Sequence, residues 1–172
     1  MKKILAGFLV ALVVMTIAGP VFAGATYDKV AKSGVVRVGM MYNSIPAAYF
    51  NDKNEWVGFD VDIAEEVVRR IGASMGKDLK AERIKVNNKT RISFLTSDQI
   101  DMSVANMTHK RERDRTIDFS ITYFFDGQKV LAKKGKFKAL KDFKGKKLAS
   151  MQGTTSEKNA MELLKKLGDP NA

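Results

Sequence analysis

The sequence predicts an α/β protein whose helices pack on a sheet of mainly parallel or mixed strands. Two observations predict this class. Short β-branched stretches alternate along the chain with longer stretches in which apolar residues recur at helical spacing. The clearest strand is 35–40 and the clearest helix is 60–75. A strand–helix–strand order needs crossover connections, so it favours parallel pairing with helices on the faces of the sheet.

The other elements follow from apolar runs and turn signals. A leader over 24–34 is expected to carry one short helix, and a polar turn over 51–54 follows a short strand at 47–50. After the long helix, the sequence predicts a strand at 83–86, a short helix at 90–95, a strand at 100–105, extended segments at 117–119 and 123–132, a strand at 148–151 and a helix at 155–167.

The N-terminus has the pattern of a secretory signal peptide. Lys2 and Lys3 precede an apolar run over 4–18, and Val21-Phe22-Ala23 places small residues where a signal peptidase cuts. The alternative is a membrane anchor, but the apolar run is short for a membrane span. We therefore expect residues 1–23 to be a signal peptide cleaved after Ala23, and the mature protein to be periplasmic.

The composition limits the partners. The net charge is +11, and eight lysines lie within 133–147. Export and the solvent-facing pattern of the basic residues argue against nucleic acid as a partner. We therefore interpret the charge as favouring solubility, with weak attraction to anionic solutes or lipid. A domain change is expected around 125–135, where an extended segment enters this lysine-rich stretch. With no cysteine, the chain can form neither a disulfide nor a cysteine-linked lipid anchor.

No strong catalytic or metal-binding constellation is present. His109 is the single histidine, no cysteine is available, and neither a G-x-S-x-G elbow nor a Walker A loop occurs. The sequence therefore predicts no catalytic residues, no metal and no cofactor.

Two segments have the chemistry of an anion site. The first, 106–113, follows a predicted strand, where ligands of open α/β folds bind. Its Thr108 offers a hydroxyl and a backbone N–H, and its Arg113 offers a planar fork that fits a carboxylate. The alternative interpretation is that Arg113 pairs at the surface with a neighbouring acid, namely Glu112, Asp114 or Asp118.

The second segment, 152–157, joins a predicted strand to a helix. Thr154 and Glu157 have capping-box spacing, and Gly153 permits a tight turn. Free N–H groups at a helix start attract an anion, although plain helix capping explains the same pattern. Two such segments together would suit an α-carboxylate.

These segments occur in an order that resembles the periplasmic polar-amino-acid-binding proteins of ABC transporters. The resemblance runs over 34–168. It rests on motifs at 34–39, 58–64, 100–101, 107–108 with Arg113, 117–120 with Tyr123, 140–147 and 152–157. It implies two α/β lobes that clamp a ligand between them.

The resemblance also implies roles for matched residues. Arg113 would hold the ligand α-carboxylate, with Thr108 and the main chain near Asn106 assisting from the first lobe. Thr154 and Thr155 would add the helix start of the second lobe. An aromatic residue near the first strand often packs on the ligand in this family, and Tyr42 and Tyr49 are the candidates here.

The glutamate/aspartate-binding subgroup is the most similar one. Arg91 lies in a segment similar to its Asn-Arg-Ile motif and would meet the ligand side chain. That subgroup has a second arginine where this chain has Met41. An acidic ligand is therefore one alternative, and glutamine, asparagine or another polar amino acid is the other.

The resemblance further implies that residues 24–125 are a first lobe without its C-terminal return segment and that 126–172 begin an incomplete second lobe. We accordingly expect exposed apolar faces, poor stability and weak or absent binding for this chain alone. The expected partners are an amino acid and an inner-membrane ABC permease, and the expected state is a monomer. The alternatives are a cationic exported interaction protein or a dehydratase that uses Glu112 or His109 as proton donor.

Overall fold

The computed structural model describes residues 24–168, so the predicted signal peptide over 1–23 lies outside the described part. The chain divides into two compact units, 1–34 and 35–172. In the first unit, helix α2 (Ala25–Ser33) confirms the short helix expected in the leader, and it ends where Gly34 adopts a left-handed φ of 72°. Within the described range, no helix has the length and apolar character that a membrane span requires.

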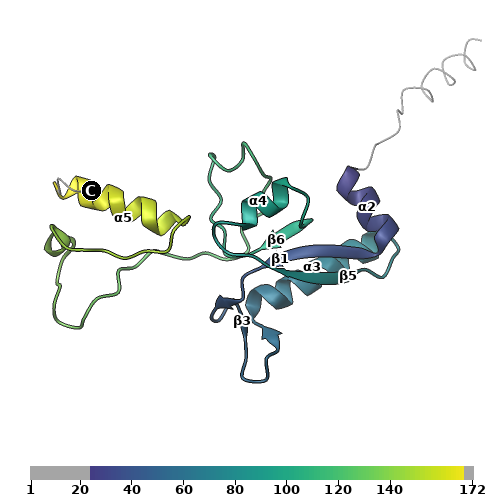
Figure 1. Cartoon of the computed structure of the whole chain (residues 1–172), viewed down its shortest axis with the longest axis horizontal. Helices are drawn as coiled ribbons and strands as arrows, with labels where there is room; N and C mark the ends of the chain where they lie inside the picture. The colour runs from purple at the N-terminus through teal and green to yellow at the C-terminus, as the bar shows by residue number, and fades with distance from the viewer. Residues whose placement is uncertain (1–23, 169–172) are drawn as a thin grey trace, which may run out of the picture. The chain divides into compact units, whose positions relative to one another are not determined.

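The centre of the second unit is a parallel sheet, as predicted. Strands β1 (Val35–Met40), β5 (Lys80–Lys85) and β6 (Met102–Val104) are arranged in the order β5-β1-β6 (Figure 1). Both partners run parallel to β1, and Val38 faces Arg83 on one side and Met102 on the other. The central strand is the most buried, and Val36, Val38 and Met40 are at most 3% exposed.

Helix α3 (Phe59–Ser74) confirms the long predicted helix and covers the sheet. It contacts all three strands, as the helical spacing of its apolar residues requires. Its buried positions are Asp60, Val61, Ala64, Val68 and Gly72. The shorter helix α4 (Arg91–Thr96) contacts β1 and β6 and confirms the helix expected there.

A small antiparallel sheet follows β1. It consists of β2 (Asn43–Ser44), β3 (Ala48–Phe50) and β4 (Trp56–Val57). Of these strands only β3 was predicted, because runs of two residues carry no detectable period. The polar turn over 51–54 is present, and the Asn51 side-chain oxygen accepts hydrogen bonds from the N–H groups of Lys53 and Glu55, at 3.0 and 2.8 Å.

The predicted strand at 148–151 is wrong. Apart from the turn of 3-10 helix η1 (Leu140–Phe143) and helix α5 (Thr155–Lys166), the described residues after β6 form no regular element. The stretches 117–119 and 123–132 likewise belong to no strand. β-propensity produces a strand only where a neighbour completes the hydrogen-bond ladder, and within 24–168 none does so for these stretches.

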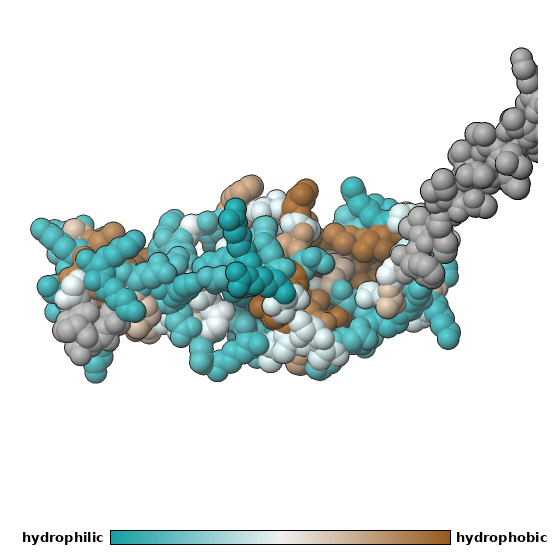
Figure 2. Space-filling view, turned by 90° about the horizontal axis from the view of Figure 1, so that it is seen from above, coloured by the Kyte–Doolittle hydropathy of each residue, from teal (hydrophilic) through white to brown (hydrophobic). Residues whose placement is uncertain are grey.

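Large apolar side chains are correspondingly exposed after β6. Ile121, Phe125 and Leu131 are 89, 88 and 99% exposed. Figure 2 shows hydrophobic residues in view among a mainly hydrophilic surface. This agrees with the expectation of exposed apolar surface.

Candidate anion-binding pocket

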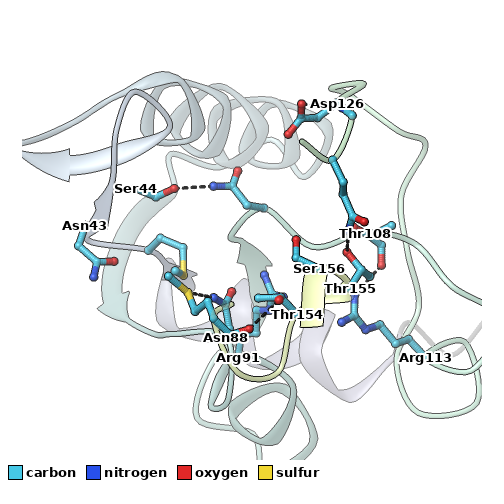
Figure 3. A pocket seen from close by; sticks show the side chains of 15 residues that line it. Asn43, Ser44, Asn88, Arg91, Thr108, Arg113, Asp126, Thr154, Thr155 and Ser156 are labelled. Atoms are coloured by element: carbon cyan, nitrogen blue, oxygen red, sulfur yellow. Dashed lines mark hydrogen bonds between the residues drawn. The ribbon is translucent and has the colours of Figure 1, made fainter. Parts of the chain in front are cut away.

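A cavity of about 270 Å³ lies where the carboxyl ends of β1 and β6 meet the start of α5 (Figure 3). Such a position is the usual ligand site of an open α/β sheet. The residues that line it are Met41, Asn43, Ser44, Asn88, Arg91, Asn106, Thr108, Arg113, Asp126, Gly127, Gln128, Met151, Thr154, Thr155 and Ser156.

Six of the eight predicted site residues lie on this cavity: Asn106, Thr108, Arg91, Arg113, Thr154 and Thr155. The two predicted aromatic residues do not. Tyr49 lies in β3, and Tyr42 has the Lys85 ammonium 5.9 Å from its ring centroid. The structure thus brings together the polar candidates from three segments and leaves both tyrosines outside the cavity.

Arg91 is held at the pocket by the turn before α4. The Asn87 side-chain oxygen accepts hydrogen bonds from the N–H groups of Lys89 and Thr90, and the Thr90 hydroxyl accepts one from the Asn87 N–H, at 3.0 Å. These reciprocal bonds fix the start of the helix at Arg91.

The Arg91 side chain is buried, and it pairs with no acid among residues 24–168. It is 2% exposed, and its Nη1 donates to the carbonyl of Ala105. Its Nε has no hydrogen-bond partner among residues 24–168. Burial, together with the nearby charge of Arg113, lowers the pKa of Arg91 to about 10. A buried cation without a counter-charge is costly, so this position favours an anion that comes from outside the chain.

The loop after β6 brings Arg113 to the same cavity. Arg113 Nη1 donates to the carbonyl of Thr108 at 2.7 Å. The alternative of a surface ion pair is not observed in the described part of the chain, because Glu112 pairs with Lys158 at 2.9 Å and Asp114 bonds His109 at 2.7 Å. The guanidinium therefore retains donors for a ligand.

The start of α5 supplies backbone donors. The Thr154 hydroxyl accepts from the Glu157 N–H at 3.3 Å and donates to the Met151 carbonyl at 2.6 Å, which confirms the predicted cap. The Glu157 carboxylate accepts from the N–H of Gly153 at 3.0 Å, one residue before the cap. Because first-turn N–H groups have no partner within a helix, this end of α5 can bind an anion.

Sequence reasoning missed several lining residues. Asn43 and Ser44 form β2, the next element after β1, and the rule that ligands bind beyond the carboxyl ends of strands could have found them. The Ser44 hydroxyl accepts from the Asn106 amide at 2.8 Å. Asp126 and Gln128 carried no signal, because their segment contains no recognisable motif.

A buried carboxyl, that of Asp60, is hydrogen-bonded to the loop that carries the pocket residue Asn106. Asp60 is 1% exposed, and its Oδ1 accepts from the Tyr123 hydroxyl at 3.1 Å. Its Oδ2 has no partner within the described residues. Burial raises the pKa of Asp60, while hydrogen bonds from Tyr123 and the Asn106 N–H oppose the rise. Burial and the adjacent Asp60 charge raise the pKa of Tyr123 above its ordinary range. Asp60 thereby connects α3 to the Asn106 loop and the Tyr123 segment.

Replacing Asp60 by asparagine is expected to remove a contribution of this carboxyl that lowers the free energy of unfolding as pH rises. A carboxyl whose pKa is raised by folding binds more protons when folded, so its contribution to stability falls as pH rises from its ordinary pKa through the raised one. The variant should therefore gain stability relative to the parent as pH rises from about 3 to 7 in urea unfolding. A stability difference that does not change with pH, or that changes in the opposite direction, would contradict this.

An α/β fold with two arginines and a helix start around one pocket has the donors that an anionic or zwitterionic solute would need. Residues 36–169 match the family model of bacterial extracellular solute-binding proteins, family 3, and the chain belongs to this family.

Known relatives agree on the class but differ in the solute. The chain is 35% identical over 137 residues to the glutamate/aspartate import solute-binding protein of Salmonella typhimurium, covering 78% of this chain and 45% of that protein. It matches an ancestral arginine-binding protein bound to arginine with 34% identity and a TM-score of 0.70, covering 78% of this chain and 58% of that one. The chain spans about half the length of the curated relatives it matches.

A further solved structure is the arginine-bound form of domain 1 of TmArgBP. It matches with 28% identity and a TM-score of 0.51, covering 56% of this chain and 72% of that one. That structure is of a single domain with its ligand.

Proposed function

We propose that the protein captures a polar amino acid outside the cytoplasm for uptake by an ABC transporter. The observation that carries the proposal is the buried Arg91, which has no acidic partner in the described part of the chain, beside Arg113 and the start of α5. Glutamate/aspartate and arginine in the names of the relatives support an amino acid as the solute. We infer a periplasmic location, cleavage after Ala23, a monomer and an inner-membrane permease as partner.

The proposed binding mode follows from the donors on the pocket. The α-carboxylate of the ligand would accept from Arg113, from the Thr108 hydroxyl and from the N–H groups of Thr154 and Thr155. Each charge-assisted hydrogen bond contributes about 1.5–3 kcal/mol when water is excluded. Several lining groups are exposed, so screening by solvent should reduce these values and leave the affinity weak.

The proposed lobe boundary at 125/126 has support from contacts on both sides. The Phe124 ring lies 5.8 Å from the ring of Phe59, in the part that contains α3. Gln128 instead donates from Nε2 to the Thr155 hydroxyl at 2.8 Å. Thus the segment changes its neighbours between 124 and 128, in agreement with a first lobe over 24–125 and a second beginning at 126.

Met41 is the proposed determinant of side-chain preference. It is 4% exposed and lines the same cavity as Arg91. Met41→Arg should shift preference toward glutamate over glutamine by roughly tenfold, since it adds a cation opposite the ligand side chain. Met41→Leu is the control that keeps the site apolar. Competition between the two amino acids measures the ratio, and an unchanged ratio in Met41→Arg would remove Met41 from this role.

The two alternative functions have less support. A dehydratase would need a proton donor at the pocket, whereas Glu112 pairs with Lys158, His109 is hydrogen-bonded to Asp114, and neither residue lines the pocket. A purely electrostatic interaction protein would not need a buried arginine such as Arg91, which lacks an acidic partner within 24–168.

Calorimetric titration of the purified protein with the polar amino acids tests the proposal. We expect saturable, one-to-one binding of at least one of them, with dissociation constants down to about the millimolar range. Failure of every polar amino acid to bind at concentrations well above that range would contradict the proposed function.

A further inference from the structure

Two buried side chains of opposite charge hold the two ends of one peptide group, the one that joins Ala105 to Asn106. The Arg91 guanidinium donates from Nη1 to the Ala105 carbonyl. On the other side, the Asp60 carboxylate accepts from the Asn106 N–H. Asp60 and Arg91 are 1 and 2% exposed, and Ala105 is 2% exposed. The peptide group therefore lies between two charges that solvent barely reaches.

Each end of the peptide dipole faces the charge that it attracts. The carbonyl oxygen is the negative end and meets the guanidinium, while the N–H is the positive end and meets the carboxylate. Hydrogen bonds to charged groups are stronger than neutral ones, and a buried environment strengthens them further. Reversing the peptide would turn both of its ends toward like charge. Each side chain thus favours the peptide orientation that the other one needs.

The backbone turns at Asn106 to present the peptide in this way. The register that pairs β1 with β6 ends at Val104, so the peptide lies just beyond the sheet. Asn106 adopts a left-handed φ of 50°, a conformation that asparagine tolerates better than most residues. Its side-chain amide donates to the Ser44 hydroxyl at 2.8 Å. The turn is thereby held from β2 as well as from α3 and α4.

The same contacts determine how Arg91 is presented to the pocket. Its Nη1 is held by the Ala105 carbonyl, whereas its Nε has no hydrogen-bond partner among residues 24–168. A long side chain loses rotamer freedom when it is fixed. Because the guanidinium is already held at one nitrogen, that freedom is lost during folding and not during ligand binding, which favours affinity.

We propose that Asp60 is a positioning residue of the binding site: it holds the Asn106 N–H, keeps the Ala105 carbonyl in place for Arg91, and so orients the guanidinium before a ligand arrives. The inference rests on the proposed function, because Arg91 is the residue expected to meet the ligand. It adds a residue that does not line the pocket and still affects the affinity.

The test compares Asp60→Asn with Asp62→Asn at neutral pH. Both substitutions remove an acid from the first turn of α3, so both change the charge at the helix start alike, but Asp62 is exposed and does not line the pocket. In NMR spectra of the ligand-free parent, Arg91 should give separate Nη signals, because the Ala105 contact slows rotation of the guanidinium. These signals should merge in Asp60→Asn and stay separate in Asp62→Asn.

Titration with L-glutamate, L-glutamine and L-arginine then measures the effect on binding. For each of them that the parent binds, Asp60→Asn should bind roughly three- to tenfold more weakly, since an oxygen of the same shape remains but its charge is lost. Asp62→Asn should bind within about twofold of the parent, because an exposed charge is screened. Separate Arg91 signals in Asp60→Asn, an affinity equal to that of the parent, or the same changes in Asp62→Asn would overturn the inference.

A further measurement uses the parent alone, so it does not depend on how the variants fold. The Asn106 N–H should exchange with solvent roughly tenfold or more slowly than an unprotected amide, because it donates to a buried carboxylate. Exchange at the unprotected rate would also overturn the inference. If the parent bound none of the three amino acids, the proposed function would fail, whereas the spectra of the ligand-free protein would still decide whether Asp60 positions Arg91.

Discussion

Replacing Arg113 by glutamine is expected to weaken amino-acid binding by roughly ten- to a hundredfold, because a charge-assisted, two-pronged contact with the carboxylate is lost. The side chain lies on the pocket, donates to the Thr108 carbonyl and forms no ion pair within residues 24–168. Its folding contribution should be small, so unfolding of the variant should resemble that of the parent. Calorimetric titration measures the loss.

Arg111→Gln provides the matched control for this prediction. Arg111 is an exposed cation two positions away and does not line the pocket. It should leave the dissociation constant within about twofold of the parent, since an exposed charge at a distance is screened. If both substitutions weakened binding equally, the effect would come from net charge and the specific role of Arg113 would be lost.

Replacing Gly58 by alanine is expected to lower the free energy of unfolding by about 2–4 kcal/mol, the sum of backbone strain and a steric clash. Gly58 precedes α3 with a φ of 129°, and an added Cβ would lie 2.7 Å from the Pro46 carbonyl oxygen. The adjacent bonds from the Phe59 N–H to Pro46 and from the Asp60 N–H to Ala47, at 3.2 and 2.8 Å, would have to shift. Asp60 would move with them.

Gly76→Ala separates the two contributions. Gly76 also has a positive φ, 63°, but its added Cβ would have nothing within 4 Å. The expected cost is about 1 kcal/mol, from backbone conformation alone. Urea unfolding of both variants measures the difference. Equal losses at the two positions would show that the clash at Gly58 contributes nothing.

The sequence predicted the elements that are long enough to show a clear hydrophobic period. β1, α3 and α5 combine an apolar pattern with clear ends, such as Gly34 and the Thr154 cap, and the structure has all three within one residue. β2 and β4 exist only through pairing with β3, which a local pattern cannot reveal. The wrong strand prediction at 148–151 has the same origin, because the apolar composition of this segment does not produce a strand without a partner strand.

The pocket residues that could be predicted are those in which a suitable donor group lies at a recognisable local position, such as a helix start. Arg113 lies in the loop after the strand predicted at 100–105, and Thr154 precedes the helix predicted at 155–167 as its cap, and both segments have an obvious donor set. Asp126 and Gln128 could not be predicted, because their position depends on side-chain bonds to α5 that join residues 27 and 31 positions apart. Tyr42 and Tyr49 were candidates as aromatic residues near the first strand, and neither lies on the cavity.

The central claim is that Arg91, Arg113 and the start of α5 form one site. Two-dimensional NMR that resolves the side-chain Nε–Hε signals of arginine and the backbone N–H signals tests it most directly, with L-glutamate, L-glutamine and L-arginine as ligands. We predict that the signals of Arg91, Arg113 and Thr155 shift together along one saturable curve for at least one of these amino acids. Shifts with different apparent affinities, or shifts confined to exposed arginines such as Arg69 and Arg70, would contradict the account.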